Sequence, residues 1–211
     1  MKRAGASFQL KVSTDELHRK LDSTSMLSEL VLPSLTADRY ALMLKHMAKA
    51  WNACLYLVSR ESGSVAVNRT WIDPEWFALR DRLYEDLESL NASARPIWEE
   101  GGPRLELDDS DPVQMAGLAY VLNGSRLGAK MIYRKLLAHS DPVIRGATRH
   151  FAAAGVPGAD WASFKKRLDD ELCTPAAVNN ACRAAALTFR LWLDVMTPRG
   201  VDALEQMVAH A

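Results

Sequence analysis

The stretch Ala119-Tyr120-Val121-Leu122-Asn123-Gly124-Ser125-Arg126-Leu127-Gly128-Ala129-Lys130 lies within a long helical pattern that begins at Asp111-Pro112, an N-cap residue followed by proline. Gly124 and Gly128 are four residues apart and therefore lie on the same face of this helix. Each glycine costs a helix interior about 1 kcal/mol relative to alanine. Because backbone without side chains lets other groups approach closely and lets a helix bend, either a packed helix or a ligand is expected on this face.

The composition indicates one globular domain spanning residues 1–211, with residues 1–9 as a flexible N-terminus. The net charge is zero, which argues against a dedicated nucleic-acid surface. The sequence shows neither a signal peptide nor an apolar run of membrane-spanning length, so it predicts a cytoplasmic protein without a membrane partner. Cys54, Cys173 and Cys182 lack metal-binding spacing and are expected to be reduced, buried thiols.

Helical periodicity and helix-start signals predict an all-α, multi-helix domain. Val65–Val67 could be mistaken for a strand, but the sequence offers it no partner strand of matching character. A short first helix is expected after the capping sequence Ser13-Thr14-Asp15-Glu16. Further helices are expected at 36–60, 73–90, 112–139, 141–155, 160–172 and 174–193, with a final turn or helix after Gly200.

The histidines are the main candidates for metal chemistry, because the chain contains no Glu-x-x-His pair, His-Glu-x-x-His motif, phosphate-binding glycine loop or Gly-x-Ser-x-Gly elbow. His46 and His150 are expected beside the core, and His139 and His210 at exposed segment ends. His18 differs from them, because Asp22 follows one turn later and can accept a hydrogen bond from one ring nitrogen. On the residues alone, a half-exposed histidine paired with Asp22 is the simpler interpretation.

A single histidine suits haem, because the porphyrin supplies the equatorial iron ligands and the protein needs to add only an axial imidazole. Haem also needs a flat slot, which the Gly124 and Gly128 face could provide. Its two propionates need cations, for which Lys11, Lys165 and Lys166 are available.

Three segments resemble the haem oxygenases, particularly the bacterial biliverdin-producing branch found with bacteriophytochromes. Residues 10–22 are similar to the first helix of that family with its proximal haem ligand. Residues 120–128 are similar to its glycine-rich distal helix, and residues 161–166 to a later helix at the haem edge. The segments occur in the family's order and span most of the chain.

The resemblance implies that His18 is the axial ligand of the haem iron and that Gly124 and Gly128 let the distal backbone lie against the haem. Ser125 stands where animal members have an aspartate that organises distal water, and bacterial members commonly have serine. Asn123 replaces an acidic residue often found in bacterial members. The implied catalytic positions are Gly124, Ser125 and Gly128, and the implied cofactor-binding positions are His18, Lys11, Tyr120, Arg126, Phe164 and Lys165, with Lys166 as the alternative to Lys165.

The implied reaction is the oxidative opening of haem to biliverdin, carbon monoxide and ferrous iron, with haem as both cofactor and substrate. It requires oxygen and an electron-donor protein, a reductase or a ferredoxin, and a bacteriophytochrome could accept the product. Two alternatives stay open: a non-catalytic haem carrier or sensor, and a helical interaction module whose Gly124 and Gly128 face packs a partner helix.

Overall fold

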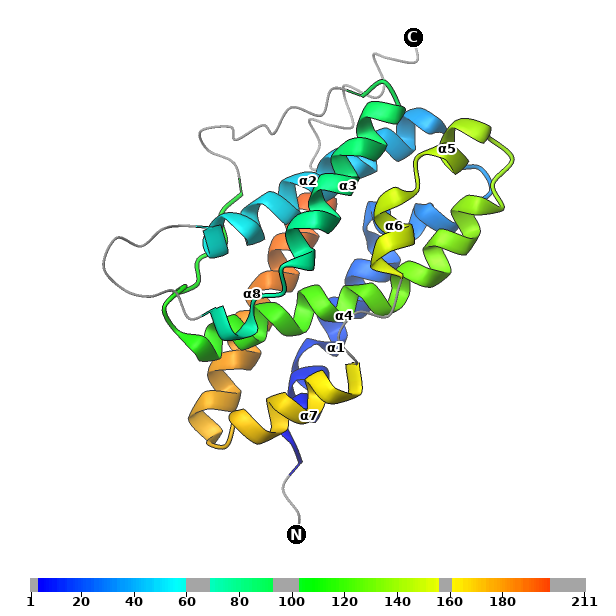
Figure 1. The fold of residues 1–211 in the computed structure, drawn as a ribbon. Helices are drawn as coiled ribbons and strands as arrows, with labels where there is room; N and C mark the ends of the chain where they lie inside the picture. Colours follow the sequence, from blue (N-terminus) through cyan, green and yellow to red (C-terminus); the bar gives the residue numbers. More distant parts are fainter. Residues whose placement is uncertain (1–3, 60–68, 93–102, 156–160, 198–211) are drawn as a thin grey trace.

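The computed structural model describes residues 4–59, 69–92, 103–155 and 161–197. Within these ranges the chain is helical without strands, so the all-α prediction is confirmed (Figure 1). The α-helices are α1 (Ala6–Thr24), α2 (Ala37–Ser59), α3 (Glu75–Ser89), α4 (Pro112–Leu137), α5 (Pro142–Gly146), α6 (Arg149–Ala154), α7 (Trp161–Glu171) and α8 (Pro175–Met196), and the 3-10 helices are η1 (Met26–Val31) and η2 (Arg69–Trp71).

Three helices begin with a capping side chain followed by proline, as the sequence predicted. Asp111 accepts a hydrogen bond from the Val113 amide at 2.8 Å at the start of α4, and Asp141 accepts one from the Val143 amide at 2.8 Å at the start of α5. Thr174 likewise caps α8. In each case the side chain satisfies a backbone donor that has no partner within the helix.

Helix α1 begins earlier than the sequence predicted. Its first residue is Ala6, so residues 6–9, expected in a flexible N-terminus, are helical. The predicted cap at Ser13 is wrong, because the Ser13 and Thr14 hydroxyls both donate to the Leu10 carbonyl within the same helix, at 3.1 and 2.8 Å. Hydroxyls can bond in this way inside a helix as well as at its start, which is why the sequence signal misleads here.

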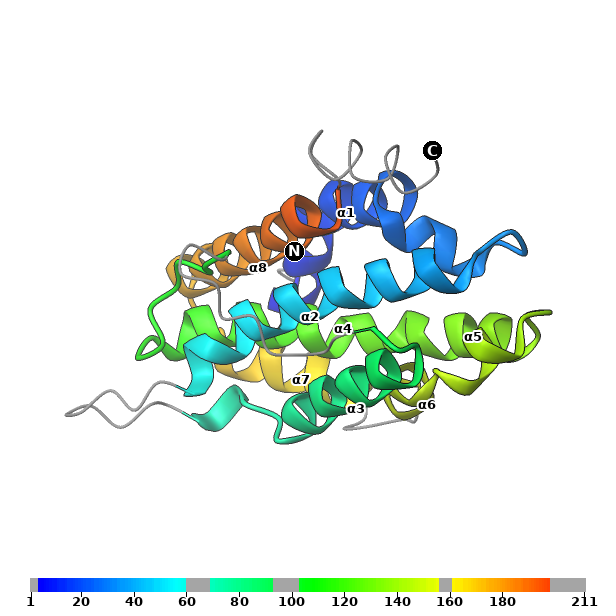
Figure 2. The ribbon, with the colours of Figure 1, turned by 90° about the horizontal axis from the view of Figure 1, so that it is seen from above.

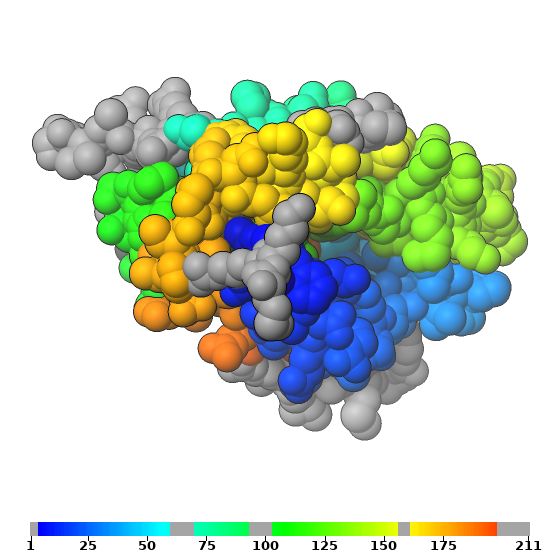
Figure 3. All heavy atoms as spheres, turned by 90° about the horizontal axis from the view of Figure 1, so that it is seen from below, coloured from blue at the N-terminus to red at the C-terminus, as the bar shows by residue number. Residues whose placement is uncertain are grey.

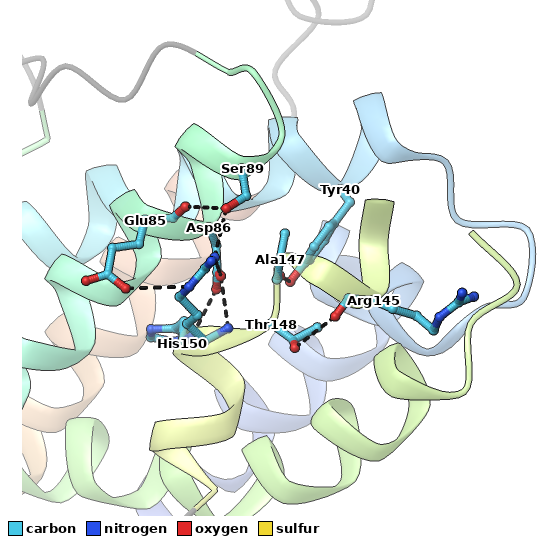
Figure 4. Close-up of polar contacts among 9 residues, drawn as sticks. Tyr40, Glu85, Asp86, Ser89, Arg145, Ala147, Thr148 and His150 are labelled. Atoms are coloured by element: carbon cyan, nitrogen blue, oxygen red, sulfur yellow. Dashed lines mark hydrogen bonds and ion pairs between the residues drawn. The ribbon is translucent and has the colours of Figure 1, made fainter. Parts of the chain in front are cut away.

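The predicted helix over 141–155 is divided into α5 and α6. The Tyr40 hydroxyl donates to the Ala147 carbonyl at 2.6 Å, and the Asp86 carboxylate accepts the amides of Arg149 and His150 at 2.9 Å each (Figure 4). In one continuous helix the Arg149 and His150 amides would instead donate to the carbonyls four residues earlier, and the Ala147 carbonyl would accept the amide four residues later. Side chains from α2 and α3 therefore fix the break.

Helix α4 runs through the middle of the molecule (Figures 1 and 2). It packs most extensively against α8 and also contacts α5, α6, α7, η1 and η2. Helix α1 packs mainly on α8. The largest fully buried side chains, which define the core around these helices, are Trp51, Trp76, Tyr40, Leu10, Met26, Leu30, Met43, Leu44, Leu55, Leu79, Leu83 and Leu87.

Within the described residues no helix is both long and apolar enough to cross a membrane. The cysteines are free thiols, as expected, but only Cys54 is buried; Cys173 is exposed and Cys182 is partly exposed. Burial was expected for Cys173 because it was placed on a helix, but it lies in the connection between α7 and α8. The expectations for Val65–Val67, for the segment after Gly200 and for His210 lie outside the described residues.

Candidate functional site

His18 projects from α1 with more than half of its side chain exposed. Its Nδ1 lies 2.9 Å from Asp22 Oδ2, one turn further along the helix, so the predicted pair is confirmed. The ring also meets Phe189 of α8 edge-on, with centroids 5.6 Å apart. A carboxylate at Nδ1 favours the tautomer with the proton on that nitrogen, which leaves Nε2 as a lone-pair donor suited to a metal.

The other described histidines are held by backbone carbonyls. His46 Nδ1 lies 2.6 Å from the Val195 oxygen and His150 Nδ1 lies 2.8 Å from the Leu79 oxygen, both in the core as predicted. His139 Nε2 lies 3.2 Å from the Pro33 oxygen, and the residue is only partly exposed. Among the histidines that the structure describes, His18 therefore combines exposure with a carboxylate partner.

Helix α1 is fixed at its start by α7. The Asp169 carboxylate accepts the Ser7 amide at 2.7 Å and the Ser7 hydroxyl at 3.0 Å, which caps the N-terminus of α1 from another helix. A Cβ at Gly5 would lie 2.5 Å from the Asp169 carboxylate, so a larger residue would disturb this cap. Sequence reasoning missed Asp169, because a cap from 162 residues away leaves no local signal.

The glycines of α4 face three different environments. A Cβ at Gly117 would collide with the Ala181 carbonyl oxygen of α8, so this glycine permits close helix packing. A Cβ at Gly124 would touch only the Trp161 ring, at 3.5 Å. A Cβ at Gly128 would meet nothing within 4 Å. In the described structure no helix packs on Gly128, and the backbone there faces open space.

Apolar side chains flank this open backbone. Leu127 is 59% exposed and Met131 is 55% exposed, and helical spacing brings both beside Gly124 and Gly128. We call these four residues the open face of α4. Large apolar side chains gathered on an exposed face are a common mark of a ligand or partner surface.

Helix α4 lies beside α1 at Tyr120 and also packs on η1, the element that follows α1. The contact at Tyr120 joins the Thr14 side chain to the Tyr120 hydroxyl. His18 is one turn after Thr14, and Gly124 and Gly128 are one and two turns after Tyr120. Figure 3 shows the molecule hollowed between α1 in blue and the yellow-green second half of α4, with α7 in yellow beside them. His18 and the open face of α4 thus lie along the same stretch between the two helices.

An aromatic cluster closes one side of this region. Trp161 lies 5.6 Å from the Tyr120 ring and stacks on Phe164 at 5.4 Å, and Phe164 meets Trp71 at 5.9 Å. Phe164 is buried in this cluster, whereas Tyr120 and Trp161 are partly exposed. Burial raises the pKa of Tyr120 above its ordinary value of 10.0, so the phenol remains protonated and can donate a hydrogen bond at neutral pH.

The candidate cations for the propionates differ in whether they already form an ion pair. Arg126 is only 10% exposed and its guanidinium lies 3.3 Å from Asp73, just before α3, so this ion pair competes with a contact to a cofactor carboxylate. Lys166 pairs with Asp170 at 2.5 Å. Lys11 and Lys165 are exposed and form no ion pair within the described part of the chain. Lys11 and Lys165 are therefore the available cations of the predicted set.

Two polar residues of the glycine stretch already have hydrogen-bond partners within the protein. The Ser125 hydroxyl donates to the Leu122 carbonyl at 2.8 Å, which satisfies its proton within α4. Asn123 Oδ1 accepts a hydrogen bond from Trp76 Nε1 at 3.0 Å. An amide at position 123 therefore ties α4 to α3, a role that the sequence alone did not reveal.

The fold and the site define a class: an all-α protein with a carboxylate-oriented imidazole on its first helix and a bare-backbone face on its central helix, the two helices that flank the hollow in Figure 3. Such a site fits a flat ligand that carries its own metal. The open space at Gly128 is the specific observation that agrees with haem.

Comparison with known proteins identifies the family. The model of the Heme oxygenase family matches residues 4–198, and the chain belongs to this family. Its reaction is the degradation of haem to biliverdin, carbon monoxide and iron. A search of curated protein sequences finds no match.

Two solved structures are similar over almost the whole chain. The haem oxygenase of Neisseria meningitidis shares 19% sequence identity, with 94% of this chain and 98% of that chain covered and a TM-score of 0.60. The haem oxygenase of Leptospira interrogans shares 15% identity, with 92% and 99% covered and a TM-score of 0.65. At these identities the likeness supports the fold.

Proposed function

We propose that this chain binds haem in the hollow between α1 and α4 and opens it oxidatively, with His18 on one side and Gly128 on the other. One observation carries the proposal: the Gly128 backbone faces open space in the same stretch in which α1 presents an exposed imidazole held by Asp22. Bound haem supplies the iron that activates oxygen and the ring carbon that is oxidised.

His18 would hold the haem iron through Nε2, which the Asp22 contact at Nδ1 leaves available. Its Nδ1–H donates to Asp22 and Phe189 supports the ring edge, so both the tautomer and the orientation are preset. Bound haem would receive less electron density from this imidazole than from a thiolate. This suits a reaction in which the ring itself is oxidised.

The open face of α4 forms the distal wall. Gly124 and Gly128 let backbone, rather than side chains, border the ligand, and the Leu127 and Met131 side chains help to exclude water. Because the Ser125 proton is bound to the Leu122 carbonyl, Ser125 offers an acceptor oxygen rather than a strong acid. The shape of this wall therefore limits how a bound molecule can lie against α4, and the wall does not supply protons directly.

Lys11, Lys165 and the Tyr120 hydroxyl supply charge and a hydrogen-bond donor for the propionate carboxylates. We assign Arg126 and Phe164 a positioning role without direct contact to the haem. Arg126 holds α4 to Asp73, and Phe164 carries Trp161, which borders Gly124. Both residues then affect the cofactor through the helices that they position.

The reaction also needs oxygen and electrons from a reductase or ferredoxin, and its product suits an acceptor such as a bacteriophytochrome. We place it in the cytoplasm, where haem, reductant and such an acceptor are available together.

An absorption titration with haemin tests the site. We expect a Soret band that saturates at one equivalent and is lost or strongly shifted in His18→Ala, with partial recovery when imidazole is added. His139→Ala is the matched control, because it removes another partly exposed histidine and should leave the band unchanged. An identical Soret band in the His18→Ala protein would exclude His18 as the ligand.

A further inference from the structure

A second cavity, of about 600 Å³, lies between α2, residues 103–106 and the second half of α8. Its volume falls within the range of about 300–1,000 Å³ that is typical of small-molecule sites. The proposed haem site does not use it.

The two sites lie on opposite sides of α8. Phe189 of α8 contacts the His18 ring, whereas Leu187, Leu191 and Asp194 line the cavity. At 3.6 residues per turn, these three positions lie roughly 140–160° around the helix from Phe189. A molecule in the cavity is therefore separated from His18 by the thickness of α8.

The cavity combines cations with an apolar wall. Lys49, Arg104 and Arg190 line it, and none of them forms an ion pair within the residues that the structure describes. Two carboxylates, Glu106 and Asp194, also line it, so cations outnumber carboxylates. Asp194 already takes part in another interaction. The apolar wall comes from Pro103, Leu105, Leu187, Leu191 and Val195.

His46 closes the cavity on the α2 side. Its Nδ1 lies 2.6 Å from the Val195 carbonyl oxygen and the residue is 8% exposed, so the ring is held in place as part of the wall. The cavity thus has a fixed wall where α2 meets α8. Its cations come from three segments: α2, the residues before α4, and α8. Because these cations line one cavity, a single carboxylate there can pair with more than one of them.

We propose that this cavity binds an organic carboxylate with an apolar body. The carboxylate would pair with Lys49, Arg104 and Arg190, and the apolar body would cover the leucines and Val195. Two sources share this chemistry: a linear tetrapyrrole such as the reaction product, and a medium-chain fatty acid. The tetrapyrrole source rests on the proposed function, whereas the fatty-acid source does not.

Calorimetric titration of ferric haem-loaded protein, without an electron donor, tests the proposal. Decanoate and biliverdin are the two probes, and decanol is the control for the apolar body alone. We expect saturable binding of at least one carboxylate at one equivalent and at least tenfold weaker binding of decanol. Heat with biliverdin only would identify a tetrapyrrole site, and heat with decanoate would identify a fatty-acid site.

Lys49→Gln and Arg104→Gln should each weaken carboxylate binding about tenfold, because each removes one charged partner. Lys45→Gln is the matched control: Lys45 is exposed one turn earlier on α2 and does not line the cavity. Circular dichroism would establish that each variant is folded. Absence of binding by both carboxylates, or equal binding by wild type, Lys49→Gln and Arg104→Gln, would overturn the proposal.

The Soret band, recorded before each titration, reports haem loading independently. Failure to load haem would count against the proposed function, whereas decanoate binding would still be measurable in His18→Ala. The two proposals can therefore fail separately.

Discussion

The two halves of α4 use glycine in opposite ways. In the first half, Gly117 is buried and leaves no room for a Cβ, because the Ala181 backbone of α8 lies directly against it. In the second half, Gly128 is exposed and a Cβ there would touch nothing. The first glycine serves helix packing and the second leaves space beside the backbone, so glycine alone does not distinguish a packing contact from a ligand surface.

The side chains around each glycine follow the same division. Met115, Ala116, Leu118 and Ala119 surround Gly117 in the core, whereas Leu127 and Met131 beside Gly128 remain exposed. A helix that is packed against α8 at Gly117 but exposes Leu127, Gly128 and Met131 further along has a surface that a ligand can complete. The following experiments test this division.

The largest effect is expected at the packed glycine. Gly117→Ala should lower the free energy of unfolding by about 3 kcal/mol, since the added methyl group forces α4 away from the Ala181 carbonyl. Urea denaturation followed by circular dichroism measures this loss. Unchanged stability would mean that α4 and α8 are packed less closely than described.

The second half of α4 depends on α6 for support, and α6 makes that support sensitive to acid. His150 is buried and burial lowers its pKa from 6.5 to about 4. The folded-state pKa of His150 lies below its unfolded value. The stability that neutral His150 contributes to the fold is therefore fully present above pH 6.5 and is lost as the pH falls toward 4. The expected loss is up to about 3 kcal/mol, measured by denaturation at a series of pH values.

Asp86 opposes part of this loss. Burial raises its pKa despite the hydrogen bonds from the α6 amides, so its protonation on acidification favours the folded state. His150→Gln is the control for the histidine contribution. It should be less stable at pH 7 but show a flatter profile between pH 6.5 and 4. A profile as steep as that of wild type would assign the acid sensitivity to other groups.

At the open glycine, the effect should fall on ligand binding and not on folding. Gly128→Leu should weaken haem binding at least tenfold, roughly 1.4 kcal/mol, because the side chain fills the open space. Its stability without haem should equal or exceed that of wild type by up to about 1 kcal/mol, owing to better helix propensity. Unchanged haem affinity would remove the open face of α4 from the site.

The smallest effect is expected at Gly124. A Cβ there would meet the Trp161 ring at 3.5 Å, which is an ordinary contact. Gly124→Ala should therefore change haem affinity less than Gly128→Leu does, by about threefold or less, and slightly raise stability. Haemin titrations of both variants in parallel make the comparison; a larger loss for Gly124→Ala would place the closest approach at Gly124 instead.

Local signals in the sequence predicted most of the fold. Asp111-Pro112, Asp141-Pro142 and Thr174-Pro175 begin helices where expected, because a capping side chain and a proline act on neighbouring backbone. The break between α5 and α6 escaped prediction, since Tyr40 and Asp86, which fix it, are distant in sequence.

The site was predictable to a similar extent. The His18–Asp22 pair follows from helical spacing and is present. Sequence could not tell which glycine packs against a helix, because that depends on where α8 lies. It also could not show that Arg126 forms an ion pair with Asp73 or that Asn123 accepts a hydrogen bond from Trp76. Both partners lie at or just before the start of α3, far from α4 in sequence.

Single turnover of haem-loaded protein in air with an electron donor is the most direct test of the central claim. The account predicts that the Soret band decays while a broad red biliverdin band rises and carbon monoxide is released. A Soret band that persists through the same treatment, with wild-type protein fully loaded, would contradict haem opening by this chain.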